Sequence, residues 1–287
     1  MVNVTITGGS GFIARALAAR LAEFPDRYRV RRVSLRGEEW KRAGFAGADC
    51  VVHTAGIAHV KGDPAMAPLY DRVNRGLALE AAQRARADGA GQFIFLSSAI
   101  VYGDAPPAGT RNIIGADTPV APSGAYGRSK LDAEEGLRAM AGEDFRVAVV
   151  RPPMVYGRGC KGNYVTLAKL ARTLPVFPRF ENRRSVLYVE NLAECLRLLI
   201  DARAQGTFWP QDGEILSTSE LVRRVAAAHG RRIALLRCLN PAVRLLGRRG
   251  LARRAFGDVA YDPALSLRPD GYRRFDVGEA IRRTEAE

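Results

Sequence analysis

Short runs of β-branched and apolar residues alternate with longer stretches of helical periodicity through the first half of the chain. The apolar runs predict strands at 2–7, 30–35, 50–54, 93–97 and 146–150. Apolar spacing predicts a helix between the first two strands, ended by Pro25, and further helices at 71–87 and about 189–202. Strands that alternate with helices are typical of βαβ units, so we expect an α/β fold with a doubly wound parallel Rossmann sheet.

The pattern changes after Arg151 to loops rich in glycine, proline and arginine, which indicates a smaller C-terminal substrate-binding lobe. We expect a dinucleotide-binding domain at 1–155, with 185–203 packing back on it. The substrate lobe would then comprise 156–184 and 204–287. Because the chain lacks an apolar run of roughly 20 residues and begins with a strand rather than a signal peptide, we expect a cytoplasmic protein.

Composition excludes several other classes of protein. Hydrophobic residues make up 47% of the 287 residues, which excludes a disordered chain. The four cysteines form no Cys-x-x-Cys pair, and the three histidines lack the spacing of a helical metal site. We therefore expect neither a disulfide framework nor a bound metal, and we expect the cysteines to be reduced core residues.

A glycine-rich turn, Thr-Gly-Gly-Ser-Gly-Phe-Ile-Ala at 7–14, connects the first strand to the first helix. Glycine at Gly8 and Gly11 lets a dinucleotide pyrophosphate approach the backbone N–H groups at the helix start, where Phe12 and Ile13 stand. Ala14 replaces the third glycine of the usual fingerprint, a change that close helix–strand packing tolerates. The motif predicts a site for NAD or NADP.

The end of the second strand bears on which dinucleotide is bound. An acidic residue there would accept hydrogen bonds from the adenosine ribose of NAD, but this chain has Ser34, Leu35 and Arg36. Without a carboxylate to repel a 2′-phosphate, and with Arg36 near enough to pair with one, NADP is at least as plausible as NAD. Arg36 as an ordinary solvated arginine is the alternative, and the choice between the two cofactors stays open.

Tyr126 and Lys130 are four residues apart, so on a helix they share one face. An ammonium group and a nicotinamide cofactor favour the phenolate, which brings the tyrosine toward a useful acid/base range. Ser98 follows a predicted parallel strand, at the end where open α/β sheets bind their ligands. Ser98 can then hydrogen-bond the substrate oxygen that Tyr126 protonates or deprotonates.

With these motifs the chain resembles the extended short-chain dehydrogenase/reductase family, and within it the NAD-dependent epimerase/dehydratase group that acts on nucleotide sugars. The resemblance covers nearly the whole length and includes the stretches 53–56, 73–74, 151–157, 159–163 and 182–192. It implies that Lys130 holds the nicotinamide ribose and that Asn163 and Arg184 bind the diphosphate of a UDP-sugar. It also implies cofactor contacts from Ala55, Gly56, Asn74 and Pro153.

The resemblance leaves more than one reaction open. Dehydratases of this group carry an Asp-Glu pair after the catalytic Ser/Thr, whereas this chain has Ala99 and Ile100, so we disfavour dehydration. We expect an enzyme that acts at C4 of a UDP-hexose or UDP-N-acetylhexosamine. The alternatives are an NADPH-dependent reductase of a UDP-4-keto-6-deoxy sugar and a non-catalytic NADP-sensing module. The family resemblance also favours a homodimer.

The formal net charge of +14 raises the question of a nucleic-acid partner. From residue 221 onward the chain has 15 arginines and seven acids, so a large part of the excess lies in the C-terminal region. An anionic ligand explains this excess as well as nucleic acid does, and we expect no nucleic-acid partner. The basic segment 239–256 has the composition of an amphipathic helix on a membrane surface, but we expect it to cover the substrate lobe instead.

Overall fold

The computed structural model describes residues 1–58, 64–248 and 250–286, which form two compact units. Unit 1 comprises Met1–Gly103, Pro119–Pro152 and Leu192–Trp209, and unit 2 comprises Asp104–Thr118, Pro153–Asn191 and Pro210–Glu287. Asp104–Thr118, which the predicted division assigned to the dinucleotide-binding domain, belongs to unit 2. Among the described residues, no helix is both long and apolar enough to cross a membrane.

Unit 1 is built on a six-stranded parallel sheet with the strand order β10-β6-β4-β3-β1-β2. Its strands are β1 (Val2–Thr7), β2 (Tyr28–Val33), β3 (Cys50–His53), β4 (Gln92–Leu96), β6 (Arg146–Val150) and β10 (Gly206–Phe208). The order reverses between β1 and β3, and ligands of open α/β sheets bind at such a switch point, beyond the carboxyl ends of the strands. The predicted doubly wound parallel sheet is confirmed, although β2 begins two residues before its predicted start.

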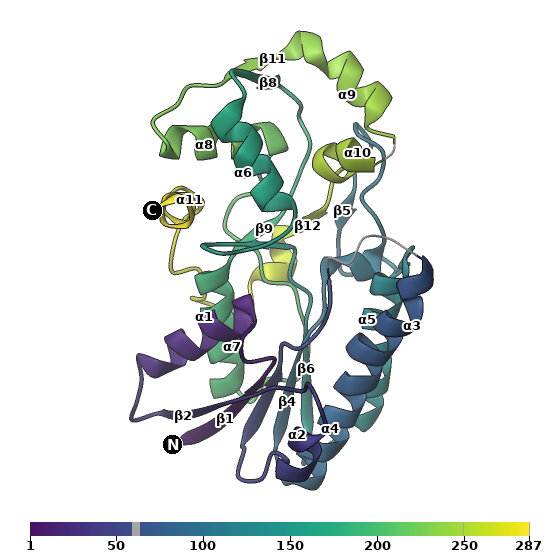
Figure 1. Cartoon of the computed structure of the whole chain (residues 1–287), viewed down its shortest axis with the longest axis vertical. Helices are drawn as coiled ribbons and strands as arrows, with labels where there is room; N and C mark the ends of the chain where they lie inside the picture. The colour runs from purple at the N-terminus through teal and green to yellow at the C-terminus, as the bar shows by residue number, and fades with distance from the viewer. Residues whose placement is uncertain (59–63, 249, 287) are drawn as a thin grey trace. The chain divides into compact units, whose positions relative to one another are not determined.

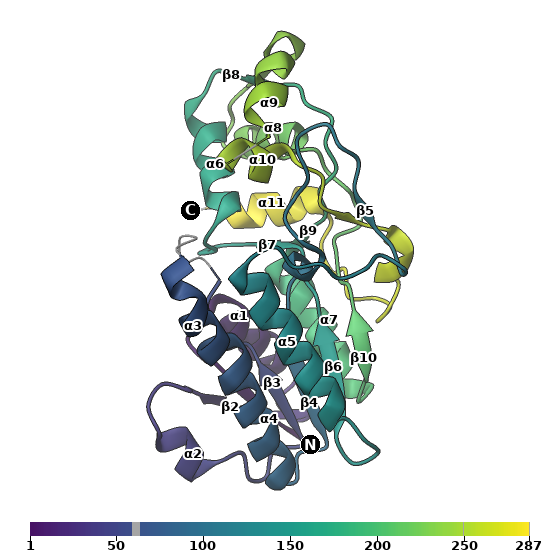
Figure 2. The same cartoon turned by 90° about the vertical axis from the view of Figure 1, so that its right-hand side faces the viewer.

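Helices cover both faces of this sheet (Figures 1 and 2). One face carries α1 (Phe12–Ala22) and α7 (Val189–Asp201), which are joined by an ion pair between Arg20 Nε and Glu194 Oε2 at 2.7 Å. The other face carries α3 (Ala67–Tyr70), α4 (Leu77–Ala87) and α5 (Ala125–Met140), while the short α2 (Glu39–Ala43) follows β2. The helix predicted at 71–87 is interrupted, because Asp71–Gly76 forms a π turn between α3 and α4.

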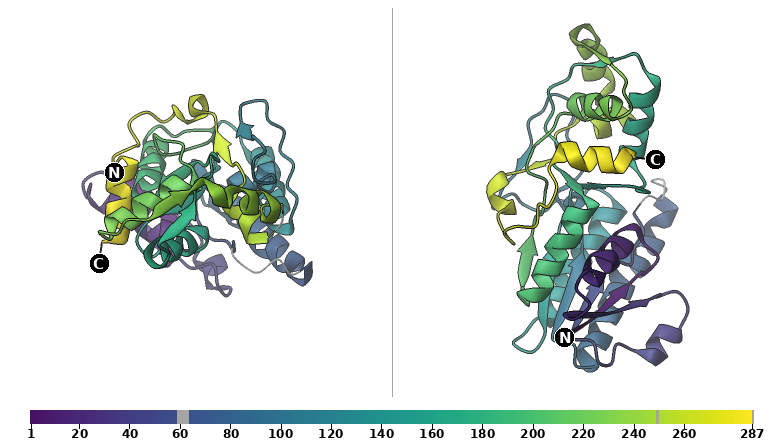
Figure 3. Two further views of the ribbon diagram at one scale, coloured as in Figure 1. Left: turned by 90° about the horizontal axis from the view of Figure 1, so that it is seen from above. Right: turned by 90° about the vertical axis from the view of Figure 1, so that its left-hand side faces the viewer.

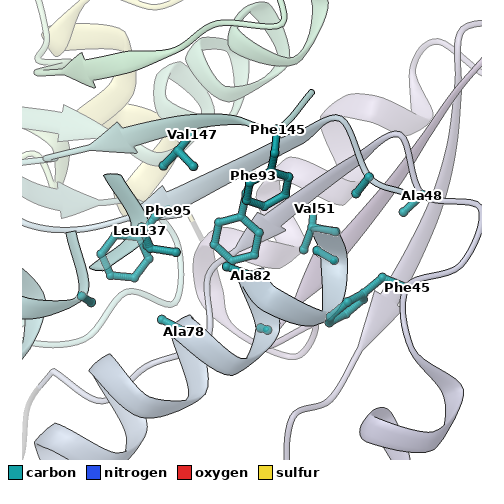
Figure 4. Packing of buried hydrophobic residues seen from close by; sticks show 14 of the residues in the cluster. Phe45, Ala48, Val51, Ala78, Ala82, Phe93, Phe95, Leu137, Phe145 and Val147 are labelled. Carbon is teal, nitrogen blue, oxygen red and sulfur yellow. The ribbon is translucent and has the colours of Figure 1, made fainter. Parts of the chain in front are cut away.

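The core on the α4 side of the sheet pairs small residues with large ones (Figure 4). Ala78, Ala81, Ala82 and Ala85 of α4 are fully buried, and their small size lets the helix approach the strands closely. Aromatic rings fill the remaining space, with Phe93 and Phe145 at a centroid distance of 6.2 Å. This packing holds β3 and β4, whose ends lead into the candidate site.

Unit 2 has short parallel strand pairs and five helices in its described part (Figure 3). The pairs are β7 (Met154–Tyr156) with β9 (Val186–Tyr188), β8 (Val176–Pro178) with β11 (Ala234–Leu236), and β12 (Ala260–Tyr261) with β5 (Ile113–Ile114). The helices are α6 (Asn163–Thr173), α8 (Thr218–Ala228), α9 (Asn240–Leu246), α10 (Gly250–Phe256) and α11 (Val277–Glu285). The predicted single basic helix at 239–256 is therefore two short helices, and Arg249 between them lies outside the described residues.

The cysteines differ in their environments. Cys50 and Cys195 are buried as expected, Cys160 is half-buried, and Cys238 is exposed. The expectation that all four are core residues is wrong for Cys238, because it lies in a 3₁₀ turn, Arg237–Leu239, at the surface of unit 2.

Candidate functional site

The glycine-rich turn lies where β1 passes into α1, beside the chain that leaves β3. Gly8 has a φ of +69°, and a Cβ atom there would lie 2.9 Å from the Cα and N atoms of Ala55. Only glycine fits this backbone and this contact. The Gly11 N–H donates a hydrogen bond to the Gly8 carbonyl at 2.8 Å, which tightens the turn just before the helix.

The N-terminus of α1 suits an anionic group. Gly11 at the N-cap supplies no side-chain hydrogen bond, and the first turn, which begins with Phe12 and Ile13, contains no acidic residue. The free N–H groups and the helix dipole there favour a phosphate. Ala14, in the place of the third glycine, is fully buried. The turn therefore fits the pyrophosphate of NAD or NADP.

Ser34 and Arg36 lie just after β2 and are exposed, while Leu35 between them is buried. The Ser34 hydroxyl accepts a hydrogen bond from the Arg36 backbone N–H at 3.2 Å, which fixes the backbone of this loop. Arg32 was not among the predicted site residues, but its Nη1 donates to the Gly9 carbonyl at 3.3 Å and its Cβ would touch a Cβ on Gly9. The sequence does contain a signal for Arg32. Side chains alternate between the two faces of a strand, so Arg32, two residues before Ser34, lies on the same side of the strand as Ser34.

Asn74 connects the loop after β3 with α5. Its side chain is fully buried and makes both hydrogen bonds to the Ile57 backbone, accepting from the N–H at 2.9 Å and donating to the carbonyl at 3.0 Å. Its Nδ2 also donates to Ser129 Oγ at 3.2 Å. Asn74 stands in the π turn, a feature that is frequent at functional sites and that apolar periodicity cannot reveal.

Gly56 lies between these elements. A Cβ atom on Gly56 would stand 3.0 Å from Asn74 Oδ1 and 3.4 Å from Lys130 Nζ. The structure thus brings together Ala55, Gly56, Asn74 and Lys130, four of the residues that the sequence analysis assigned to the cofactor. His53, at the end of β3, is fully buried, and burial together with the Lys130 charge lowers its pKa to about 3, so this imidazole is neutral.

Tyr126 and Lys130 lie on the first two turns of α5, and Ser98 begins the 3₁₀ turn Ala99–Tyr102 just after β4. The Ser98 hydroxyl lies close enough to the Tyr126 phenol to lower its pKa by hydrogen bonding. Lys130 Nζ donates to the Leu96 carbonyl at 2.7 Å, which anchors the ammonium at the end of β4. The helix and the strand end therefore bring the three predicted catalytic residues into one place.

The electrostatics of this set are dominated by burial. Burial raises the pKa of Tyr126, and the hydrogen bond from Ser98 acts in the opposite direction. Burial also lowers the pKa of Lys130 to about 8, although the Glu134 carboxylate partly offsets this effect. The protein chain by itself thus disfavours the phenolate, which is the opposite of the lowered tyrosine pKa expected from the sequence, and Lys130 is not among the described groups that shift this pKa.

A buried ion pair lies one helical turn after Lys130 on α5, and it was not predicted from the sequence. The Glu134 side chain is fully buried and accepts three hydrogen bonds from Arg151, one from Nη2 at 2.6 Å and two from Nε at 3.0 and 3.2 Å. Ser97, the neighbour of Ser98, donates to the same carboxylate, and Arg151 Nη1 donates to the Tyr102 hydroxyl at 2.7 Å. The sequence contains one signal for this residue: Glu134 is eight residues after Tyr126 and four after Lys130, so all three share one face of the helix.

The remaining predicted residues belong to unit 2, where Pro153 is buried and Asn163 is exposed at the first position of α6. Arg184 is only 7% exposed, and its Nη1 donates to the carbonyls of residues 254, 255 and 257 at 2.8, 3.5 and 3.1 Å. Its Nε has no hydrogen-bond partner among the described residues. Burial lowers the pKa of Arg184 to about 10, while Asp258 nearby favours the charged form.

Comparisons with known proteins show the family of the chain. Residues 4–208 match the model of the NAD dependent epimerase/dehydratase family. A UDP-glucose 4-epimerase from Vibrio cholerae is 36% identical over 186 residues. That match spans 62% of this chain and 56% of the relative, so the chain matches little more than half of that protein.

Two solved structures resemble the chain over almost its full length. One is the UDP-glucose 4-epimerase of Thermus thermophilus in complex with NAD, with 21% identity, a TM-score of 0.76, and coverage of 99% of this chain and 98% of the other. The second is a human epimerase family protein with NADPH, with 18% identity, a TM-score of 0.76, and coverage of 99% of both chains. At these identities the likeness shows the fold.

Proposed function

The chain belongs to the NAD dependent epimerase/dehydratase family of NAD(P)-dependent enzymes, and from this premise we propose that it acts at C4 of a UDP-hexose or UDP-N-acetylhexosamine. The observation that carries the proposal is the placement of Ser98 next to the Tyr126 phenol, together with the buried Lys130 that is anchored at the end of β4. A hydroxyl pair of this kind suits one substrate alcohol, because both groups reach the same oxygen.

In this reaction Tyr126 takes the proton from the C4 hydroxyl or returns it to the C4 ketone. Ser98 hydrogen-bonds the same oxygen and orients it. Lys130 holds the nicotinamide ribose, and its positive charge favours the phenolate form of Tyr126. The cofactor supplies the chemistry of the carbon centre, since its nicotinamide ring accepts and returns a hydride. Gly8 and Gly11 let the pyrophosphate approach the start of α1.

Two arguments support a UDP-sugar as the substrate. The Vibrio cholerae relative is named a UDP-glucose 4-epimerase and is 36% identical to this chain over 186 residues. Unit 2 offers an arginine, Arg184, whose guanidinium Nε lacks a partner among the described residues, and a guanidinium is the side-chain group that suits a diphosphate best. Asn163, at the start of α6, is the second proposed contact to the diphosphate.

A reductase that consumes NADPH on a UDP-4-keto-6-deoxy sugar is the second candidate, and the loop after β2 favours it. Ser34 and Arg36 are exposed there, and Arg32 lies against the glycine turn, so a 2′-phosphate meets arginines rather than a carboxylate. A cofactor that arrives reduced and leaves oxidised suits a reductase, whereas an epimerase regenerates its cofactor in every cycle.

The experiment is to denature the purified protein and identify the dinucleotide that it releases, then to supply UDP-sugars with NAD or NADPH. Retained NAD together with C4 inversion of a UDP-sugar supports the epimerase. A site that takes up NADPH, and oxidises it only when a UDP-4-keto sugar is present, supports the reductase. Dinucleotide binding without turnover on either class of substrate would contradict both and leave the non-catalytic sensing module.

A further inference from the structure

The most cationic stretch of the chain lies in unit 2. No aspartate or glutamate occurs between Glu220 and Asp258, whereas ten arginines do. Arginines on other helices of unit 2 are paired: Arg223 with Glu220, for example, and Arg283 with Glu279, at 2.7 and 2.8 Å.

The arginines around α9 are exposed and carry no such pairing. Arg237, Arg244 and Arg248 are all exposed, and none of them forms an ion pair with another described residue. Their charge is therefore not neutralised locally, and it produces a positive potential over this end of unit 2.

Two leucines are exposed among these charges. Leu245 and Leu246 at the end of α9 are 73% and 65% exposed, whereas Val243 of the same helix is buried. Single exposed leucines are ordinary, but two adjacent ones between Arg244 and Arg248 form a compact apolar surface with a cationic rim. We call Arg244, Leu245, Leu246 and Arg248 the leucine–arginine patch.

The helix that carries the patch is fixed at both ends. Asn240 Nδ2 donates to the Arg179 carbonyl at 2.9 Å, and the Ala108 N–H donates to the Gly247 carbonyl at 3.0 Å. A Cβ atom on Gly247 would stand 2.4 Å from Ala108 Cβ, so the chain passes very close to that segment. In Figures 1 and 3, α9 lies at the end of unit 2 away from α11. The leucines therefore point outward from a helix held in place.

We infer that the leucine–arginine patch docks unit 2 on an anionic lipid surface. Arginines next to such a surface pair with its negative headgroups, and the two leucines bury their side chains at the boundary with the acyl chains. Duplex DNA would satisfy the arginines but offers no apolar layer for adjacent leucines. Contact of this kind needs no membrane-spanning helix, and no helix of the described residues is long and apolar enough to span a membrane.

The test measures binding of the full-length protein to vesicles by co-sedimentation, with phosphatidylglycerol vesicles compared with neutral phosphatidylcholine vesicles. We expect binding to the anionic vesicles only, and weaker binding in high salt. Arg244→Gln with Arg248→Gln should weaken it about 25-fold, because each arginine near the surface contributes about fivefold. Leu245→Ser with Leu246→Ser should weaken it at least about tenfold while the charge stays the same.

Matched controls separate the patch from general charge and general exposure. Leu267 is 64% exposed elsewhere in unit 2, and Leu267→Ser should leave vesicle binding unchanged. Arg29→Gln with Arg42→Gln removes two exposed charges from unit 1 and should reduce binding less than about threefold at physiological salt. Circular dichroism and dinucleotide affinity verify that every variant is folded.

Three outcomes would overturn the inference. The first is equal binding to neutral and anionic vesicles, or to neither. The second is binding to duplex DNA that depends on Arg244 and Arg248 but not on the leucines, which would assign nucleic acid to the patch. The third is a concentration-dependent dimer that Leu245→Ser with Leu246→Ser dissociates, which would assign a second copy of this chain.

Discussion

Replacing Glu134 with alanine should destabilise the protein more than any other single change of a charged residue in unit 1. The side chains of Glu134 and Arg151 are 0% and 7% exposed, so the substitution leaves a buried guanidinium that retains the Tyr102 hydroxyl but loses its carboxylate. Removing one partner of a buried ion pair costs about 3–5 kcal/mol. Since small proteins are stable by about 5–15 kcal/mol, the expected loss is a large fraction of the total.

Arg138 provides the matched control for this prediction. It binds the same carboxylate at 2.7 Å, but its side chain is 41% exposed. Arg138→Ala should therefore cost about 0–1 kcal/mol, as exposed ion pairs do. The double change Glu134→Leu with Arg151→Met removes both buried charges and should be more stable than Glu134→Ala alone, because no charge is then buried without a partner.

Urea unfolding, followed by circular dichroism, measures all three variants at neutral pH. The linear extrapolation gives the free energy of unfolding, and an unchanged slope verifies that the variants unfold as the parent does. A loss for Glu134→Ala below about 1 kcal/mol, or equal to the loss for Arg138→Ala, would refute the reasoning, since the carboxylate would then be solvated rather than buried.

Three other predictions concern the ligands and the pH dependence. Ser34→Asp should lower the NADP/NAD affinity ratio, because a carboxylate binds the ribose hydroxyls and repels a 2′-phosphate; an unchanged ratio of dissociation constants would mean that the loop after β2 does not meet the ribose. Arg184→Ala should weaken UDP binding about 10- to 100-fold in calorimetric titration, with Arg184→Lys intermediate, and leave the dinucleotide unaffected. The same variant should also lose about 1.5–3 kcal/mol of unfolding free energy, because a charged donor to three carbonyls is removed. Lys130 has a pKa of about 8, so its charge is lost as the pH rises through this value, and kcat/KM should fall on the alkaline side with an apparent pKa near 8; a profile that stays flat to about pH 9.5 would contradict this assignment.

The parts of the fold that the sequence predicted are those with strong local signals. β1 and β6 have the predicted bounds because their β-branched runs end at glycine or proline, and α1 ends as predicted shortly before Pro25. The π turn of Asp71–Gly76 was not predicted, since Val73, Leu77 and Ala81 keep a regular helical spacing through it into the following helix. Local periodicity reports which residues face the core, but not the hydrogen-bonding pattern of the backbone.

The site was predictable where one motif is continuous in the chain, and less so where distant polar residues meet. Tyr126 and Lys130 were found from their spacing, whereas the Glu134–Arg151 pair depends on α5 packing beside the end of β6. Arginines are rarely buried, so nothing in the sequence distinguished the buried Arg184 from its exposed neighbours. The exposure of Leu245 was not predicted either, because leucines are usually buried and the segment 239–256 was expected to cover the substrate lobe.

The most direct test of the central claim compares the wild-type protein with Tyr126→Phe in a C4 assay. Each is incubated with its dinucleotide and a UDP-hexose, a UDP-N-acetylhexosamine or a UDP-4-keto sugar, and the configuration at C4 is followed by NMR. The account predicts inversion or reduction at C4 by the wild type, and a rate about 10²–10⁴-fold lower in Tyr126→Phe with nearly unchanged dinucleotide affinity. Turnover by Tyr126→Phe at a rate close to that of the wild type would contradict it.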